Sequence, residues 1–494
     1  MFRKHPKELL PVIMVNMFAR FAFFTLMSVF ILFLSGKSGL TFEKTSIIYS
    51  IFYFAIFILT FVGGFVADKT RNYKGSILKG LVLIAIGYTV IAISTISGQS
   101  WVFLTTISIA LFLIALGKGL FQGNMQTILG QMYDNPNYSQ MRDSGFLLSN
   151  LFGNIGVLFA PLVAVGIRNS WISHKGFVYE SNLSWLCNEY IANGKDMDSY
   201  NHFMDLAVSS GQGTMEISEF ATQYLYAINT GFSFTFLLAA VAMVASVVIF
   251  LWNEKKFPIP AKLDFQTSKI DTKIIKQRVY AFLTVFGVLN LFAIAFYQDG
   301  LALRLFVRDY TELQNWGIDF SKVNTFFFIL ATPIVLAIFR ALRAKGRELS
   351  TLKKMSIGMG IAAVAYLVMM FGSIGLPNKT DLIVFSETQR VIPFLFGTYF
   401  ILAIAELFVY PLLSSFISQF ARPKHQGIMQ SVCLLATVIG NYLLFLGVIM
   451  YERIPVWVTW FIFASICLIS MIVLLLILKW VEKTMKNEVY NAST

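Results

Sequence analysis

The chain has 494 residues, of which 57% are apolar and only 13% are charged. Together with a mean hydropathy of +0.69, this composition excludes a disordered chain and argues strongly against a soluble globular protein. The net charge of +13 would favour nucleic acid as a partner of a soluble chain. The three cysteines have neither the number nor the spacing of a disulfide framework or a zinc site.

Twelve long apolar segments follow one another along the chain. Each is long enough for a membrane-spanning helix of about 20 residues, and a helix satisfies its own backbone hydrogen bonds in lipid. The first segment follows a short basic N-terminus without a signal-peptide cleavage site, so we expect it to be retained. The predicted spans are 9–34, 46–67, 76–97, 101–131, 145–167, 224–251, 279–306, 320–341, 352–375, 393–420, 427–450 and 456–481.

Two long polar connections divide the spans. Residues 252–278 are rich in lysine and contain Pro258 and Pro260. They predict a linker between an N-terminal six-helix bundle, 1–251, and a C-terminal six-helix bundle, 279–494. The second connection, 168–223, lies between the fifth and sixth spans and carries most of the acidic residues predicted outside the cell.

The distribution of Lys and Arg over the loops predicts the orientation. With the N-terminus in the cytoplasm, 26 of the 39 basic residues lie on the cytoplasmic side and 11 on the other side. The positive-inside rule therefore predicts a multi-pass protein of the plasma (inner) membrane with both termini in the cytoplasm. Attraction to anionic lipid accounts for the basic loops, so no nucleic-acid partner is expected.

Three ionisable residues lie deep inside predicted spans: Arg20, Lys118 and Glu406. A charge in the middle of a bilayer costs a few kcal/mol and usually serves a function. Two cations and one anion from the two halves suit a zwitterion such as a peptide, whereas the alternative is a structural ion pair that holds the halves together. Asp299 and Arg304, near the outer end of the seventh span, line the cavity or belong to a loop.

A conformational latch is predicted at the cytoplasmic end of the second span. Its residues are Gly64, Asp68, Lys69 and Arg71, where the glycine allows close helix approach and the aspartate can cap or pair with a neighbouring helix end. The alternative is a short basic turn that follows the positive-inside rule.

The chain has none of the common enzyme motifs: no His-Glu-x-x-His, no Gly-x-Ser-x-Gly and no phosphate-binding P-loop. We therefore expect a protein that is not an enzyme and that needs no cofactor or metal. Transport would have to use gradients, because no nucleotide-binding domain is present. The sequence does not define the oligomeric state, and a monomer is compatible with it.

The topology resembles the major facilitator superfamily, an all-α membrane fold of two six-helix bundles. Short motifs also follow one another in order along both halves: His5-Pro6-Lys7, Gly63-Gly64-x-x-Ala67-Asp68, Gly117-Lys118-Gly119-Leu120-Phe121-Gln122-Gly123-Asn124, Arg142-Asp143-Ser144-Gly145-Phe146, Asn154, Gly156, Ala160-Pro161, Glu406-Leu407, Pro411, Gly427 and Gly440-Asn441-Tyr442. Through these motifs the chain resembles the proton-dependent oligopeptide transporter family of that superfamily.

The resemblance implies roles for four residues. Arg20 matches the arginine that faces the peptide carboxylate, and Asn154, Asn324 and Glu406 match the cluster that holds the peptide amino end. The charges agree with these roles, because Glu406 can pair with an ammonium and the amides can hydrogen-bond a peptide backbone.

The chain departs from the family at residues tied to proton coupling and carboxylate binding. The first-span motif Glu-x-x-Glu-Arg-Phe-x-Tyr-Tyr reads Asn16-Met17-Phe18-Ala19-Arg20-Phe21-Ala22-Phe23-Phe24 here, so both glutamates and both tyrosines are replaced. Gln122 replaces the family's lysine, and Tyr297 replaces a glutamate. Lys118, one helical turn before Gln122, is a candidate replacement cation. Glu406 is then the leading candidate for proton coupling and Asp299 the second.

The sequence thus predicts alternating-access transport of di- or tripeptides, or similar small zwitterions, with a proton as the coupling ion and import as the direction. One alternative is an uncoupled or differently coupled transporter or exporter of a non-peptide organic ion, because the family's coupling glutamates are absent. Another is a non-transporting receptor that uses 168–223 as its ligand-binding domain.

Overall fold

The computed structural model describes residues 4–94, 100–258, 272–311, 313, 320–376, 391–421 and 424–491, and the regular elements in these ranges are all helical. Eleven of the described helices are long and apolar enough to cross a membrane. The remaining expected span, 427–450, forms two shorter helices, α14 (Gln426–Tyr442) and α15 (Leu444–Arg453). Residues 259–271 of the predicted linker lie outside the described residues.

The contacts group the chain into two compact units. Unit 1 comprises Met1–Lys7, Gln126–Leu151 and Pro258–Thr494, and unit 2 comprises Glu8–Met125 and Phe152–Phe257. Two helices, α4 (Ser100–Gln131) and α5 (Arg142–His174), contribute to both units. The predicted boundary between two six-helix bundles at 252–278 stays a prediction.

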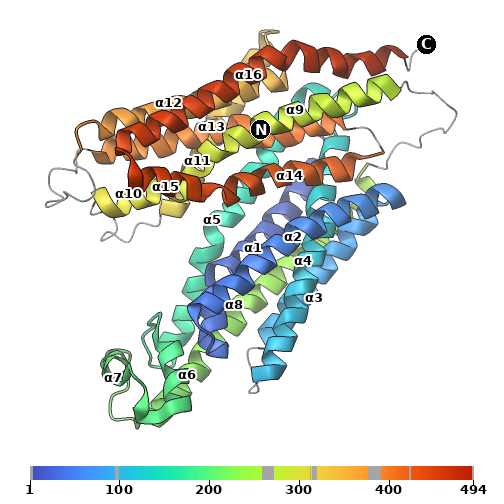
Figure 1. Ribbon diagram of the computed structural model, residues 1–494. Helices are drawn as coiled ribbons and strands as arrows, with labels where there is room; N and C mark the ends of the chain where they lie inside the picture. Colours follow the sequence, from blue (N-terminus) through green and yellow to red (C-terminus); the bar gives the residue numbers. More distant parts are fainter. Residues whose placement is uncertain are drawn as a thin grey trace. The chain divides into compact units, whose positions relative to one another are not determined.

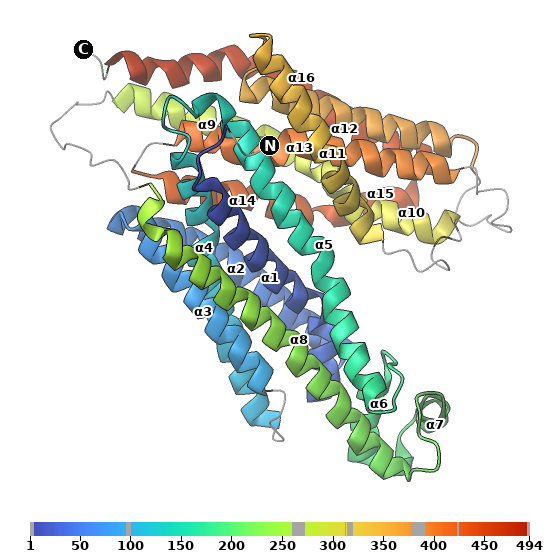
Figure 2. The same ribbon diagram turned by 180° about the vertical axis from the view of Figure 1, so that it is seen from behind.

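Unit 2 contains long helices that lie side by side (Figure 1). In addition to its parts of α4 and α5, they are α1 (Leu9–Ser38), α2 (Phe42–Thr70), α3 (Tyr73–Ser94) and α8 (Ile217–Asn253), which ends in the 3₁₀ turn η3 (Glu254–Lys256). α8 packs against α1 and α3, and α5 runs beside it in Figure 2.

Glycines bring these helices close together. A Cβ atom added to Gly80 of α3 would lie 2.5 Å from the carbonyl oxygen of Gly117 in α4, and Gly63 of α2 meets the backbone of Gly119. Small residues of this kind allow close backbone approach in a membrane, where packing replaces the hydrophobic effect as the driving force between helices. α4 is therefore packed against both α2 and α3.

The connection between α5 and α8 is folded. It forms α6 (Leu183–Asn193), the 3₁₀ turn η2 (Gly194–Asp196) and α7 (Tyr200–Ser209) at one end of the unit (Figure 1). α6 packs on the ends of α1 and α8, and its Asn188 side chain donates to the carbonyl oxygen of Gly36 at 2.5 Å. The residues between α5 and α8 thus form a small helical cap, whereas the two ends of the predicted connection 168–223 belong to α5 and α8 themselves.

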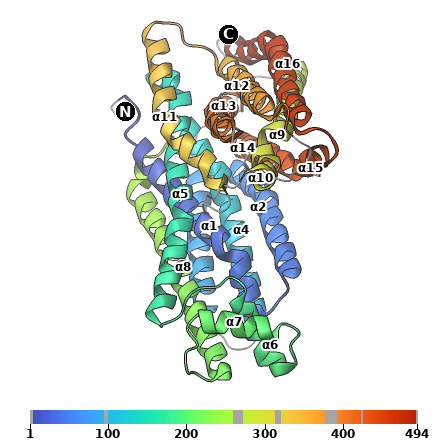
Figure 3. The ribbon, with the colours of Figure 1, turned by 90° about the vertical axis from the view of Figure 1, so that its left-hand side faces the viewer.

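Unit 1 contains the later helices. After the short η1 (Ser139–Met141) and the first residues of α5 come α9 (Thr272–Phe296), the 3₁₀ turn η4 (Tyr297–Gly300), α10 (Ala302–Tyr310), α11 (Phe320–Ala344), α12 (Thr351–Ser373), α13 (Ile392–Phe420), α14, α15 and α16 (Val456–Asn491). α12 packs against α13 and α16, while α9 packs against α14 and α16, and these helices form one group in Figure 3.

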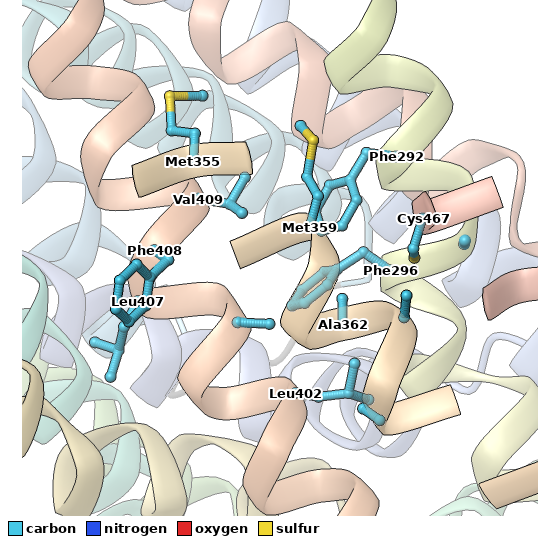
Figure 4. Packing of buried hydrophobic residues seen from close by; sticks show 14 of the residues in the cluster. Phe292, Phe296, Met355, Met359, Ala362, Leu402, Leu407, Phe408, Val409 and Cys467 are labelled. Carbon is cyan, nitrogen blue, oxygen red and sulfur yellow. The ribbon is translucent and has the colours of Figure 1, made fainter. Parts of the chain in front are cut away.

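Unit 1 contains a large cluster of buried apolar residues. Figure 4 shows Met355 and Met359 of α12 with Phe292 and Phe296 of α9 and side chains of α13. All four of these residues are buried. Flexible methionines fill irregular gaps between aromatic rings, so the core fixes α9, α12 and α13 as the frame for the polar residues described below.

Two of the expected spans are broken in the structure: the eleventh, which forms α14 and α15, and the seventh. The seventh, expected over 279–306, stops being α-helical at Phe296, continues as η4 and restarts as α10 after Leu301, whose φ of −139° is not helical. Backbone without regular helical bonding inside a membrane is tolerated where protein covers it or a cavity adjoins it. The break places Tyr297 and Asp299 on irregular backbone.

Candidate functional site

In unit 2 the half-buried arginine of α1 meets the asparagine of α5. Arg20 donates from Nη1 to Oδ1 of Asn154 at 3.2 Å. A Cβ atom on Gly156 would lie 2.6 Å from the Met17 carbonyl oxygen, and one on Gly153 would lie 2.8 Å from Cδ of Arg20. The glycines of α5 therefore allow α1 to approach and leave room for the arginine side chain.

A second cation lies close to this pair. Nζ of Lys118 in α4 lies 2.8 Å from the centre of the Phe23 ring, an arrangement in which the ring's negative face attracts the ammonium. Arg20 is also an electrostatic neighbour of Lys118, and both side chains are half-buried. Two neighbouring cations repel each other in a partly buried place, so this region favours an anion. Gln122, one turn further along α4, is half-buried as well.

In unit 1 the acidic residue of α13 meets the asparagine of α11. Asn324 donates from Nδ2 to Oε2 of Glu406 at 2.8 Å, and both residues are half-buried. A hydrogen bond from a neutral amide fixes the carboxylate without neutralising its charge. Glu406 can therefore still attract an ammonium group.

Tyr297 and Asp299 lie on the η4 turn. The Tyr297 ring packs at 5.4 Å from the ring of Tyr410 in α13, and a Cβ atom on Gly440 of α14 would lie 2.8 Å from Cδ2 of Tyr297. Asp299 is half-buried, with Arg304 among its electrostatic neighbours. Its carbonyl oxygen accepts a hydrogen bond from the Tyr399 hydroxyl at 3.4 Å.

The predicted latch residues lie at the junction of α2 and α3. Asp68 is buried and accepts a hydrogen bond from the Tyr73 hydroxyl at 2.6 Å. Gly64 is buried as well, whereas Lys69 is exposed and Arg71 takes a left-handed φ of 57° at the helix end. In the structure Asp68 thus ties the end of α2 to the start of α3, and its role as a latch stays a prediction.

Sequence reasoning missed an ion-pair network at the start of α5. Asp143 accepts from Nζ of Lys354 at 2.7 Å and from the hydroxyls of Ser415 at 2.6 Å and Thr351 at 3.1 Å. The Asp143 and Lys354 side chains are only 8% and 2% exposed. Lys354 also contacts Glu348 at 3.2 Å. We call these five residues the Asp143 network.

The residues on either side of Asp143 make further contacts with distant helices. Arg142 pairs with Asp134 at 2.6 Å and donates to the Ser418 hydroxyl at 3.0 Å, while Ser144 accepts from Arg343 at 3.2 Å. Three successive side chains thus connect α5 to α11, α12 and α13. In the sequence this Arg-Asp-Ser triplet appeared only as a family motif, and its adjacent opposite charges were the one available signal.

Five of the predicted substrate-site residues fall into two clusters. Arg20, Lys118 and Asn154 lie together in unit 2, and Asn324 lies with Glu406 in unit 1. The structure therefore shows a cationic cluster and an acidic cluster, each within its own unit.

Comparisons with known proteins identify the family. The POT family model matches residues 74–279 and 260–461. The peptide transporter YePEPT of Yersinia enterocolitica is 25% identical over 98% of this chain and 96% of its own length. Dipeptide and tripeptide permease A of Edwardsiella piscicida is 22% identical over 88% of this chain and 84% of its own.

A solved structure agrees in fold. The major facilitator superfamily transporter FucP in its outward conformation superposes with a TM-score of 0.66 at 14% identity, over 96% of this chain and 99% of that one. The chain therefore has the major facilitator fold, as the resemblance implied. Because the family model covers most of its length, the chain belongs to the POT family.

Proposed function

We propose that this protein carries di- or tripeptides, or similar small zwitterions, across the membrane by alternating access. The observation that carries the proposal is the pair of oppositely charged clusters. Arg20 and Lys118 would attract the carboxylate of a zwitterion, and Glu406 would attract its ammonium. The relatives named as peptide transporters support the same substrate class.

Charge-assisted hydrogen bonds give this arrangement its specificity. The planar guanidinium of Arg20 can donate two parallel bonds to a carboxylate, and each charged bond is worth about 1.5–3 kcal/mol. Asn154 holds the guanidinium at 3.2 Å, and Asn324 holds the Glu406 carboxylate at 2.8 Å. Both charged groups are therefore positioned before the substrate binds, which reduces the entropy lost on binding.

Proton coupling is the second part of the proposal. Glu406 is the first candidate because its carboxyl group would bind the substrate ammonium and would lose that affinity on protonation. Asp299 is the second candidate, since it lies on the irregular η4 turn beside Tyr297, the residue that replaces the family's glutamate. Import from the outside, in a plasma (inner) membrane with both termini in the cytoplasm, completes the proposal.

One observation favours a different coupling. Asn16 and Ala19 of α1 occupy the positions of two family glutamates, and Tyr297 occupies a third. Asn16 is buried at 5% exposure and so fills its position with a group that does not titrate. A transporter or exporter of a non-peptide organic ion without proton coupling is therefore the alternative function.

Uptake by proteoliposomes separates the two functions. Under the first, dialanine enters faster when an inward proton gradient is imposed, and Glu406→Gln abolishes that acceleration. Uptake that is indifferent to the gradient supports the alternative.

Lys79→Ala is the matched control for Lys118→Ala, because Lys79 is an exposed lysine on α3 of the same unit. Normal dialanine uptake by Lys118→Ala would show that Lys118 is not the replacement cation.

A further inference from the structure

A cavity of about 900 Å³ lies in unit 1, and its lining contains no residue of either candidate cluster. The N-terminal segment, the start of α5 and the last turns of α11 enclose it. Its lining includes Lys4, His5, Leu148, Pro333, Arg340 and Arg343. The distribution of Lys and Arg over the loops predicts that these last turns of α11 lie on the cytoplasmic side.

One end of this cavity is strongly basic. Lys4, His5, Arg340 and Arg343 contribute to the lining, which contains no acidic residue. Among the described residues, the ion pairs of this region join Arg343 to Glu348 at 3.1 Å and do not include Lys4 or Arg340, which are both exposed. Burial, with a smaller contribution from the positive charge of Arg343, lowers the pKa of His5 to about 4.

The other end of the cavity is apolar and reaches into the membrane-spanning part of α11. Pro333, Leu336 and Leu148 line it, and α11 is one of the helices able to span a membrane. Residues 333 and 343 are ten positions apart, which is about 15 Å along a helix axis. That length is about half of the hydrocarbon thickness of a bilayer.

We propose that this cavity binds an anionic phospholipid. Lys4, Arg340 and Arg343 receive the phosphate, and an acyl chain lies along Pro333 and Leu336. A soluble anion would use only the basic end, whereas a lipid fills both ends of the cavity. Basic pockets at the cytoplasmic ends of spanning helices are suited to such headgroups.

The bound lipid would also connect parts of the fold. His5 contacts the Tyr133 hydroxyl at 2.7 Å, and Arg343 donates to Ser144 at the start of α5 at 3.2 Å. A phosphate held between Lys4 and Arg343 would therefore fasten the N-terminal segment to α11 and α5. This inference does not depend on the identity of the transported substrate.

Lipid titration of the full-length protein in detergent tests the proposal, with native mass spectrometry for bound lipid and thermal shift for stability. Phosphatidylglycerol should bind at least tenfold more tightly than phosphatidylcholine. Each basic residue near anionic lipid is worth about fivefold in affinity, so Lys4→Ala with Arg340→Ala should weaken phosphatidylglycerol about thirty-fold. The matched control is Lys345→Ala with Arg347→Ala, two exposed cations outside the cavity lining.

A second variant tests the apolar end separately. Ala337 lines the cavity and is exposed, so Ala337→Trp should fill the groove and displace the acyl chain while the fold and every charge remain. Equal binding of the two lipids, or equal loss in the control pair, would overturn the proposal. Stabilisation by inorganic phosphate or glycerol phosphate equal to that by phosphatidylglycerol would also overturn it, in favour of a soluble-anion site.

Discussion

The Asp143 network and the cationic cluster around Arg20 use charged residues in opposite ways. In the network, Asp143 and Lys354 are buried and touch at 2.7 Å, so opposite charges neutralise each other within the fold. In the cluster, Arg20 and Lys118 are neighbours of the same sign and half-buried. The first arrangement stabilises one conformation, whereas the second is most stable when an anion joins it.

The sign and burial of neighbouring charges distinguish residues that stabilise the fold from residues that bind a ligand, without reference to a family motif. A buried ion pair is complete within the protein, and removal of one partner leaves a charge stranded in a low-dielectric place. A pair of like charges is incomplete, and a ligand of opposite sign relieves the repulsion.

The largest effect is expected from breaking the buried ion pair. Asp143→Asn or Lys354→Met alone should destabilise the protein by about 3 kcal/mol. Lys354→Met leaves the buried Asp143 carboxylate without its cation, and Asp143→Asn leaves Lys354 with only its longer contact to Glu348. The double variant should recover most of this loss, since neither charge then remains. Thermal unfolding in detergent measures the three differences.

The neighbouring residue provides the control for this experiment. Lys353 precedes Lys354 on α12 but is exposed, so Lys353→Met should change stability by less than about 0.5 kcal/mol. If the stability losses of the two single variants add up in the double variant, Asp143 and Lys354 are not energetically coupled. The Asp143 network would then not differ from the Arg20 cluster in the way described.

The cationic cluster should respond through the ligand rather than through stability. Arg20→Ala should weaken a dipeptide by about 1.5–3 kcal/mol, the value of a charge-assisted hydrogen bond, or about 10- to 100-fold. The unfolding temperature should change little or rise, because removal of one cation relieves the repulsion with Lys118. Calorimetric titration with a dipeptide and its C-terminal amide measures the effect.

The amide is the decisive ligand in that experiment. The original protein should prefer the free carboxylate over the amide, and Arg20→Ala should lose most of that preference. If Arg20→Ala weakens both ligands equally, Arg20 does not recognise the carboxylate and the cluster has another role.

The space beside Arg20 gives a smaller and sharper test. A methyl group at Gly153 would lie 2.8 Å from Cδ of Arg20, whereas one at Gly166 in the same helix has nothing within 4 Å. Gly153→Ala should therefore push the guanidinium away from Asn154 and weaken the dipeptide about tenfold. Gly166→Ala, the matched control, should leave binding unchanged and stabilise the helix by up to about 1 kcal/mol. Equal binding in the two variants would show that the Arg20 position is unimportant.

The sequence predicted those features in which a residue contrasts with its local surroundings. Arg20, Lys118 and Glu406 stand out because a charge in an apolar span is costly. Asn324 does not stand out, since a single amide in a span has many structural uses, and only the family resemblance singled it out. The structure then placed it 2.8 Å from Glu406.

Other features depend on contacts that local sequence does not reveal. Asp143 and Lys354 are 211 residues apart, and both fall near loops in which charged residues are expected. The role of Gly153 requires knowing that α5 packs on α1 beside Arg20. The break after Phe296 contains no proline, so a hydropathy pattern predicts one continuous span through it.

The smallest effect is expected at the N-terminus, where the docked His5 is kept neutral instead of being paired with an opposite charge. The docked His5 contacts the Tyr133 hydroxyl at 2.7 Å, and burial and the nearby Arg343 lower its pKa from 6.5 to about 4. Between these values a released His5 binds a proton and a docked one does not, so docking weakens as the pH falls from 6.5 towards 4. Lys4 lies beside His5 and adds a further positive charge.

A thiol probe measures this docking. In a Pro6→Cys variant the thiol replaces a buried residue of the docked segment. After correction for thiol ionisation with a free cysteine peptide, its labelling rate should rise about threefold between pH 7 and pH 6, the change in docking that a pKa of 6.5 lowered to about 4 produces. Adding His5→Gln should remove the pH dependence, because the glutamine amide can donate to or accept from the Tyr133 hydroxyl but does not titrate in this range. A corrected rate that rises equally in both proteins would show that protonation of His5 does not control the docking of the N-terminal segment.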